Sequence, residues 1–191
     1  FAILALAMTI TMLTGGIDLS VVGVANLSAI VAALILTRLA PGTESVAWLA
    51  LAMLAAVCVG LLAGLFNGIT VAVFGLPPIL ATLGSGLIFT GIAIALTGGS
   101  AVMGFPAQAA WLGNATLWGV PVPLLLFALL AGGLAFVLAR TAFGLKVQMY
   151  GANPLAAHFA GVDVTRLLVR VYAVSGMLAA IAGLVVMSRA N

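Results

Sequence analysis

Charged side chains are nearly absent from this chain. Only 5% of its 191 residues are Asp, Glu, Lys or Arg, whereas 65% are hydrophobic and the mean hydropathy is +1.41. Residues 45–139 contain no charged residue at all. Soluble domains carry roughly 25% charged residues, because their surface must face water. The composition therefore excludes a water-soluble fold and fits a chain that is solvated by lipid.

Residues for catalysis or metal binding are equally scarce. The chain has one cysteine (Cys58), one histidine (His158) and three acids. A lone cysteine in an apolar run forms no disulfide or thiol pair, and a single histidine cannot build a metal site. No G-x-x-x-x-G-K-[ST] motif is present, and Ser85 between two glycines lacks the partners of a hydrolase triad. We predict no catalytic residue, no metal and no cofactor bound by this chain.

Long apolar runs predict an all-α, polytopic transmembrane helical bundle. A helix that crosses the bilayer needs about 20 apolar residues. These runs lack the alternation of β-branched and polar residues that would favour the strands of a barrel. We expect about six spans, at residues 1–13 (truncated), 17–37, 46–74, 79–97, 122–139 and 169–188. The run 46–74 exceeds one bilayer thickness, so it tilts or extends beyond the membrane. The chain opens in mid-run at Phe1, so we expect residues 1–191 to be a single transmembrane domain from a longer protein.

Basic residues predict the orientation of these spans. Four of the six lie between the last two spans, namely Arg140, Lys146, Arg166 and Arg170. The positive-inside rule makes this loop, at about 140–169, cytoplasmic, and the clustering fits membrane orientation better than nucleic-acid binding. Residues 14–16 and 75–78 then lie inside, whereas 38–45 and 98–121 lie outside. Three tryptophans fall near the outer face, where indole rings favour the headgroup boundary: Trp48, Trp111 and Trp118. Arg38 is the exception, with Glu44 close to it in sequence.

Glycine spacing predicts a close helix contact. Gly60, Gly64 and Gly68 recur every four residues and so form a groove on one face of the 46–74 helix. A neighbouring backbone can approach closely there, because no side chain intervenes. Ala179 and Gly183 offer a weaker version in the last span. Such packing does not distinguish a transporter from a channel.

Two segments interrupt the apolar runs. Residues 14–20 (TGGIDLS) place Asp18 in an apolar region, where a charge costs at least about 2.5 kcal/mol and usually faces a bundle interior or a water-filled path. Gly15 and Gly16 allow unwound backbone, and Asp18 or Ser20 can cap the next helix. The segment is either a capped helix start at the membrane edge, which the residues alone slightly favour, or a helix break that lines a permeation path.

The second interruption is residues 76–84 (LPPILATLG), where the fourth span opens. Pro78 suits the first helical turn, and paired prolines stiffen the entry. Uncharged polar groups surround this hairpin: Asn67, Thr82, Ser85 and Thr90. They either bond across helices, which is the commoner use, or offer hydroxyl and amide groups to a polar solute.

Residues 153–161 (NPLAAHFAG) read as a complete short helix. Asn153 is the expected N-cap, Pro154 the first helical residue and Gly161 the left-handed stop. Leu155 and Phe159, four residues apart, share one face. Such an exposed apolar pair needs a protein partner or the lipid interface to dock against. His158 is expected to be a solvated loop residue.

Five motifs, in this order, resemble the inner-membrane permeases of ribose-type ABC importers. They are TGGIDLS at 14–20, LPPILATLG at 76–84, TGG at 97–99, RTAFG at 140–144, and YGAN at 150–153 with Ala156, Ala157 and Gly161 after it. The resemblance runs over nearly the full chain. It implies a bacterial inner-membrane subunit that pairs with a second permease copy and sits on cytoplasmic ATP-binding subunits, which carry ATP and Mg. It also implies that a periplasmic sugar-binding protein delivers a monosaccharide.

The resemblance implies two sets of functional residues. In this family the loop motif E-A-A-x-x-x-G forms a coupling helix that docks on the ATPase, and here Leu155 stands in place of the glutamate. The coupling residues are then Asn153, Leu155, Ala156, Ala157, Phe159 and Gly161. An alternating-access pathway or gate would include Gly15, Gly16, Asp18, Ser20, Asn67, Pro77, Pro78 and Thr82.

Other cargoes and another class of protein stay open. Within the family, the solute is alternatively a polyol, a nucleoside or a signalling sugar derivative. From a different class, the chain is a secondary carrier or channel with no ATPase partner. The short capped helix argues against this second alternative, because such carriers have no dedicated docking element.

Overall fold

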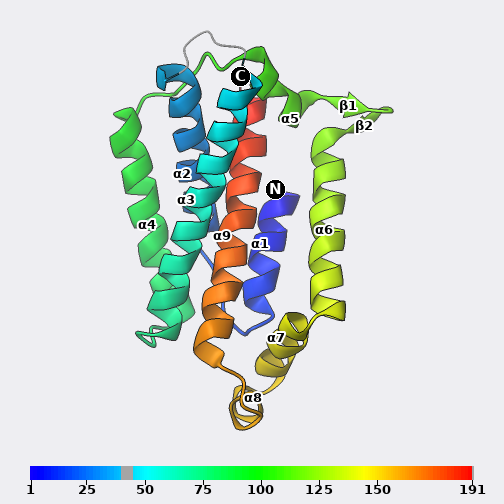
Figure 1. The fold of residues 1–191 in the computed structure, drawn as a ribbon. Coiled ribbons are helices and arrows are strands. Elements are labelled where there is room, and N and C mark those ends of the chain that lie inside the picture. The colour runs from blue at the N-terminus through cyan, green and yellow to red at the C-terminus, as the bar shows by residue number, and fades with distance from the viewer. Residues whose placement is uncertain (40–44, 191) are drawn as a thin grey trace.

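The computed structural model describes residues 1–39 and 45–190, which form a bundle of long apolar helices (Figure 1). The all-α prediction is confirmed. Strand within the described residues is limited to β1 (Thr116–Leu117) and β2 (Val120–Pro121), which pair antiparallel in a small hairpin.

Five helices are long and apolar enough to cross a membrane: α2 (Val21–Leu34, continued by the π-helical turn η1, Ile35–Leu39), α3 (Val46–Ala72), α4 (Pro78–Thr97), α6 (Val122–Arg140) and α9 (Val164–Arg189). The first expected span is shorter, because α1 (Ala2–Met12) has 11 residues. At 1.5 Å per residue it is about 16 Å long, roughly half of the hydrocarbon core. Four short helices complete the described chain: η2 (Ala107–Ala110), α5 (Trp111–Asn114), α7 (Ala142–Ala152) and α8 (Pro154–Phe159).

Two expected boundaries were wrong. The second span begins at Val21 rather than at residue 17, since the chain between α1 and α2 stays non-helical. The last span begins at Val164 rather than at residue 169, because α9 carries Arg166 and Arg170 on turns that precede its apolar stretch. The segment 140–169 was expected to be a loop with one short helix, but it contains α7, α8 and the start of α9.

Helix α9 lies at the centre of the bundle. It packs against α1, α2 and α3, and most of it is buried (Figure 1). Helices α4 and α6 lie at the periphery and expose most of their apolar side chains. Lipid tails solvate such faces as well as a protein interior does. Helices α1, α2 and α3 therefore shield α9, whereas α4 and α6 present apolar surfaces that a bilayer can solvate.

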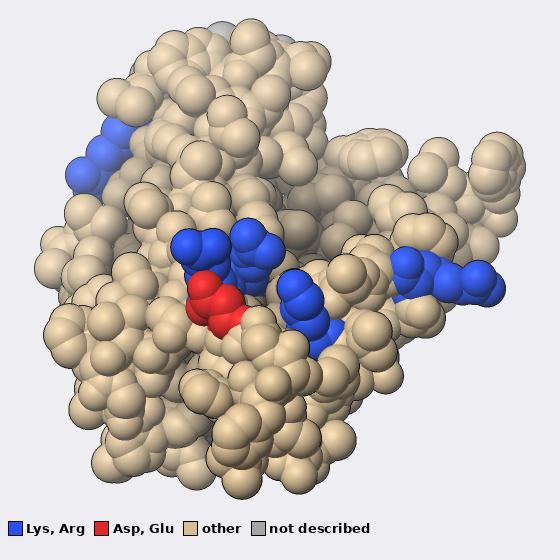
Figure 2. Space-filling view, turned by 60° about the horizontal axis from the view of Figure 1, so that its bottom comes forward, with Lys and Arg blue, Asp and Glu red and all other residues tan. Residues whose placement is uncertain are grey.

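The turns between helices alternate between the two ends of the bundle. One end, called the α8 end here, holds the α1–α2 and α3–α4 turns together with α7 and α8, and the other, the α5 end, holds α5 and the β1–β2 hairpin (Figure 1). This alternation agrees with the expected topology. Trp111 and Trp118 are exposed at the α5 end, and Trp48 lies in the first turn of α3. Basic side chains gather at the α8 end (Figure 2). Glu44, expected near Arg38, lies outside the described residues.

The glycine groove of α3 faces α9. A Cβ atom on Gly60 would overlap the carbonyl oxygen of Gly176, and one on Gly64 would overlap that of Tyr172. A Cβ on Gly68 would lie 2.7 Å from the Cα of Val169. The backbone of α9 therefore occupies the space that side chains on these three glycines would need, which is the small-residue packing typical of membrane helices.

Candidate functional site

The α8 end carries a helical hairpin built from local capping signals. Helix α7 ends at Ala152, and Asn153 separates it from α8. The side-chain oxygen of Asn153 accepts a hydrogen bond from the Ala156 amide at 3.0 Å, and Pro154 is the first residue of α8. Gly161 has a φ of +76°, the left-handed conformation that ends such a helix. The helix predicted at 153–161 is thus present, with its N-cap and its stop where the sequence places them.

Helix α8 presents an apolar pair away from the bundle. Leu155 and Phe159 are 65% and 81% exposed, whereas Ala157 on the opposite side is fully buried. Ala156 and His158 are also exposed, and the His158 ring makes an edge contact with Phe159 at a centroid distance of 6.1 Å. Because Ala157 anchors the helix, the pair is held outward on a defined surface rather than on a loose loop.

A short, hydrogen-bonded connection joins α8 to α9. The amide of Val162 donates to the Ala157 carbonyl at 3.1 Å. Asp163 then caps α9, because its Oδ1 accepts the Arg166 amide at 2.9 Å and its Oδ2 pairs with the Arg166 guanidinium at 3.0 Å. Only a few hydrogen-bonded residues therefore separate α8 from α9, the central helix of the bundle.

The α1–α2 connection is a non-helical break that contains a buried carboxylate. Gly15 has a φ of +74°, and Asp18 is 1% exposed. The Oδ1 of Asp18 accepts hydrogen bonds from the amide and the hydroxyl of Ser20, at 3.0 and 2.6 Å. Its Oδ2 accepts one from the Ser175 hydroxyl on α9, at 2.9 Å. Of the two residues expected to cap α2, Asp18 accepts a free amide at the helix start, that of Ser20, whereas the Ser20 side chain forms no cap because its hydroxyl donates to Asp18.

Two further helices hold the break in place. Asn67 of α3 donates through its amide to the Ser20 hydroxyl at 2.6 Å. The Thr82 hydroxyl of α4 accepts the Leu19 amide at 3.0 Å and lies 3.1 Å from the Ile17 carbonyl. Ser85 and Thr90 instead bond to carbonyls of their own helix. These five residues, Asp18, Ser20, Asn67, Thr82 and Ser175, are called the polar network below, and their bonds tie α3, α4 and α9 to the break between α1 and α2.

The glycine and proline residues expected near a gate also surround this point. A Cβ on Gly16 would lie 2.8 Å from the Tyr172 hydroxyl and 3.5 Å from the Pro78 Cβ. Pro77 is the exposed N-cap of α4, and Pro78 is its first residue. The structure therefore brings Gly16, Pro78 and the polar network together, while Gly15 and Pro77 lie at the edge of the cluster.

Sequence reasoning missed two participants, Ser175 and Tyr172. Both are fully buried in α9, and their run resembles any other apolar span. Ser175 is 157 positions from Asp18, so no local spacing indicates the contact. The Tyr172 hydroxyl and the Asn67 side-chain oxygen are buried without a hydrogen-bond partner among the described residues. The polar network therefore keeps spare hydrogen-bonding capacity beside the carboxylate.

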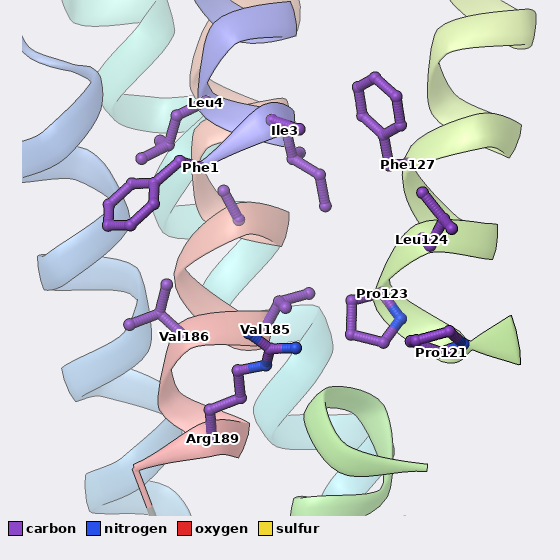
Figure 3. Close-up of a pocket in the computed structure, with 12 residues that line it drawn as sticks. Phe1, Ile3, Leu4, Pro121, Pro123, Leu124, Phe127, Val185, Val186 and Arg189 are labelled. Atoms are coloured by element: carbon purple, nitrogen blue, oxygen red, sulfur yellow. The ribbon is translucent and has the colours of Figure 1, made fainter. Parts of the chain in front are cut away.

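A separate cavity of about 360 Å³ lies between α1, α6 and α9 (Figure 3). Apolar side chains such as Ile3, Phe127 and Val185 form its walls, and Arg189 is the charged residue among those that line it. The Arg189 guanidinium is committed to the Gly113 carbonyl at 3.1 Å. With this lining the cavity offers little to a polar solute, and the polar network is the stronger candidate for function.

Comparison with known proteins decides the family. The family model described as "Branched-chain amino acid transport system / permease component" matches residues 1–191. The chain belongs to this permease family. It is a multi-pass membrane protein with the helices described above.

Curated relatives of this permease carry transport names. The "Autoinducer 2 import system permease protein LsrC" of Escherichia coli is 35% identical over 187 residues, which cover 98% of this chain and 53% of the relative. The "Galactofuranose transporter permease protein YtfT" of Escherichia coli is 37% identical over 186 residues, covering 97% and 52%. The "Autoinducer 2 import system permease protein LsrD" of an Enterobacter species is 32% identical over 192 residues, covering 97% and 57%. The chain thus spans about half the length of these relatives. No solved structure matches it significantly.

Proposed function

We propose that this permease segment belongs to an ATP-driven importer of the bacterial inner membrane, which moves a monosaccharide or a related sugar-derived solute by alternating access. The observation that carries the proposal is the exposed pair Leu155 and Phe159 on a capped helix at the basic end of the bundle. The names of the relatives, which concern autoinducer 2 and galactofuranose, support a small polar cargo of this class.

A partner subunit supplies the energy in this proposal. ATP and Mg are bound by a separate cytoplasmic ATP-binding subunit, and α8 docks on it through Leu155 and Phe159. The absence of a glutamate at Leu155 suits an apolar docking surface, since two exposed large hydrophobic side chains gain most from leaving water. A periplasmic sugar-binding protein delivers the solute, and a second permease copy completes the membrane part.

The contacts of α9 support a path for the motion. When the ATP-binding subunits close, they displace α8, and the short connection at Val162 and Asp163 moves α9 with it. The Ser175 hydroxyl then pulls on Asp18, which holds the break between α1 and α2. Asn67 and Thr82 extend the same network to α3 and α4. In this proposal Asp18 connects α9, which the ATP-binding subunits move, to the helices that open and close the pathway. Asp18 is a positioning residue rather than a catalytic one.

The experiment is a coupled transport assay on the full-length permease that contains this segment, reconstituted with its ATP-binding subunit and binding protein. Phe159→Asp places a charge in the docking surface. It should lower both solute uptake and the ATP hydrolysis that loaded binding protein stimulates by about tenfold or more, since burying an unpaired charge costs well over 1.4 kcal/mol. The matched control is His158→Asp, which adds the same charge to the same helix beside the apolar pair and should keep most of the activity.

Two results would oppose the proposal. Normal coupled uptake with Phe159→Asp would remove α8 from the coupling step. Uptake by the permease alone, in liposomes without any ATP-binding subunit, would favour a secondary carrier or channel.

A further inference from the structure

A second feature of the α8 end is a cavity of about 330 Å³ between α7 and α9. Three basic residues line it, Lys146 from α7 and Arg166 and Arg170 from α9, together with Asp163. Figure 2 shows basic side chains gathered around an acidic one on this face. Nothing in the coupling role of α8 requires basic groups from two helices to converge on one cavity.

The charges around this cavity do not balance. Asp163 is committed to Arg166, through the 3.0 Å ion pair and through its cap of the Arg166 amide. That ion pair is the one salt bridge found within residues 1–39 and 45–190, so Lys146 and Arg170 have no acidic partner there. Lys146 and Arg170 are both exposed and line the same cavity, so their like charges add to a positive potential there. The cavity therefore has the electrostatic character of an anion site.

The side chains that line the cavity indicate which class of anion it would bind. Arg170 offers a planar fork of donors and Lys146 a compact charge, which together suit the oxygens of a phosphate group. Phe143 and Leu167 add apolar surface to the same cavity. A cavity of this volume lies in the ordinary range for a small ligand or headgroup. The phosphate of a phospholipid carries a glycerol and acyl chains, so it can contact both the basic and the apolar surface of the cavity. A free phosphate can contact only the basic surface.

The position of the cavity favours a lipid as the source. Its lining includes Ala142, the first residue of α7, and it lies beside the first turns of α9, which continues as an apolar membrane-length helix. Basic pockets between membrane helices on the cytoplasmic side are suited to anionic headgroups. We propose that this cavity binds the phosphate headgroup of an anionic phospholipid from the cytoplasmic leaflet, held by Lys146 and Arg170.

A headgroup at this position would bridge α7 to α9. These two helices flank α8, so the lipid would fix the hairpin that presents Leu155 and Phe159. The binding itself is independent of the transport role proposed above, because it depends only on the cavity and its charges. Its effect on coupling rests on that role.

The test is lipid binding by the purified full-length protein in a neutral detergent, measured by native mass spectrometry during titration with short-chain phosphatidylglycerol. Replacing both bases, Lys146→Gln with Arg170→Gln, should weaken binding about 30-fold, because each base near an anionic surface contributes roughly a factor of five. Lys146→Arg should retain binding, and Arg38→Gln, at the α5 end, should leave it unchanged.

Each other outcome overturns the proposal. Unchanged phosphatidylglycerol binding by the double variant places the lipid elsewhere. Equal binding of phosphatidylcholine shows that the negative headgroup is not recognised, and equally tight binding of inorganic phosphate shows a site for a free anion. If the double variant keeps its lipid but loses association with the ATP-binding subunit, the bases belong to a protein interface instead.

Discussion

Gly64 provides the most quantitative test of the helix packing. Its position in α3 faces the backbone of α9, where a Cβ would overlap the Tyr172 carbonyl oxygen and lie 2.9 Å from the Ala173 Cα. The nearest atoms are all backbone, so no side chain can rotate away. In Gly64→Ala the two helices must therefore separate locally or bend.

The magnitude follows from two opposing effects. Overpacking of a tight core costs typically 1–3 kcal/mol, and a rigid backbone neighbour places this site near about 3 kcal/mol. Alanine is the better helix former by about 1 kcal/mol, which offsets part of the cost. The expected net loss in unfolding free energy is about 2 kcal/mol. Gly133→Ala in α6 is the matched control, because no atom lies within 4 Å of its Cβ position, and it should gain about 1 kcal/mol.

The assay is reversible unfolding of the purified protein in mixed micelles with increasing dodecyl sulfate, followed by circular dichroism. The two variants should differ by about 3 kcal/mol, in opposite directions from the unsubstituted protein. If both alanines stabilise the protein, α9 does not occupy the groove formed by Gly60, Gly64 and Gly68. The central position of α9 would then be refuted.

Two further predictions concern the polar network and the hairpin. Asp18→Ala removes three hydrogen bonds and leaves two buried serine hydroxyls without their acceptor, so unfolding free energy should fall by about 2–4 kcal/mol in the same assay. Asp18→Asn keeps an acceptor oxygen and should lose less, and equal losses would contradict a role for the hydrogen-bond geometry. Asn153→Ala removes the α8 cap, worth about 1 kcal/mol, and should speed amide hydrogen exchange in residues 155–159 roughly fivefold while α9 stays protected. Unchanged exchange there would show that the cap does not stabilise α8.

Features with local causes could be predicted from the sequence. The membrane-length helices follow from apolar runs, and the short helix at 153–161 follows from Asn153, Pro154 and Gly161, whose effects act within one turn. The alternation of the turns follows from counting spans. The resemblance to sugar importer permeases also agrees with the family that the whole chain matches.

Features with distant causes could not be predicted. The glycines and Asp18 indicate an interruption near residue 17, but the start of α2 at Val21 depends on bonds from Thr82 and Ser175, far along the chain. Helix α7 was missed because its mixed composition, with Lys146 and Gln148, resembles a solvated loop. The early start of α9 was missed because its first turns are charged. The assignment of the polar network to a solute gate stays a prediction.

The proposed exposure of α8 to the cytosol, and its proposed contact with an ATP-binding subunit, are tested most directly by chemical labelling at position 159. In the full-length permease with Cys58→Ser, the variant Phe159→Cys carries a single thiol within this segment. A membrane-impermeant maleimide should modify it in inside-out vesicles but not in intact spheroplasts, and bound ATP-binding subunit should protect it. Labelling from the outer face, or equal labelling with and without that subunit, would contradict the role of α8 as the contact with an ATPase.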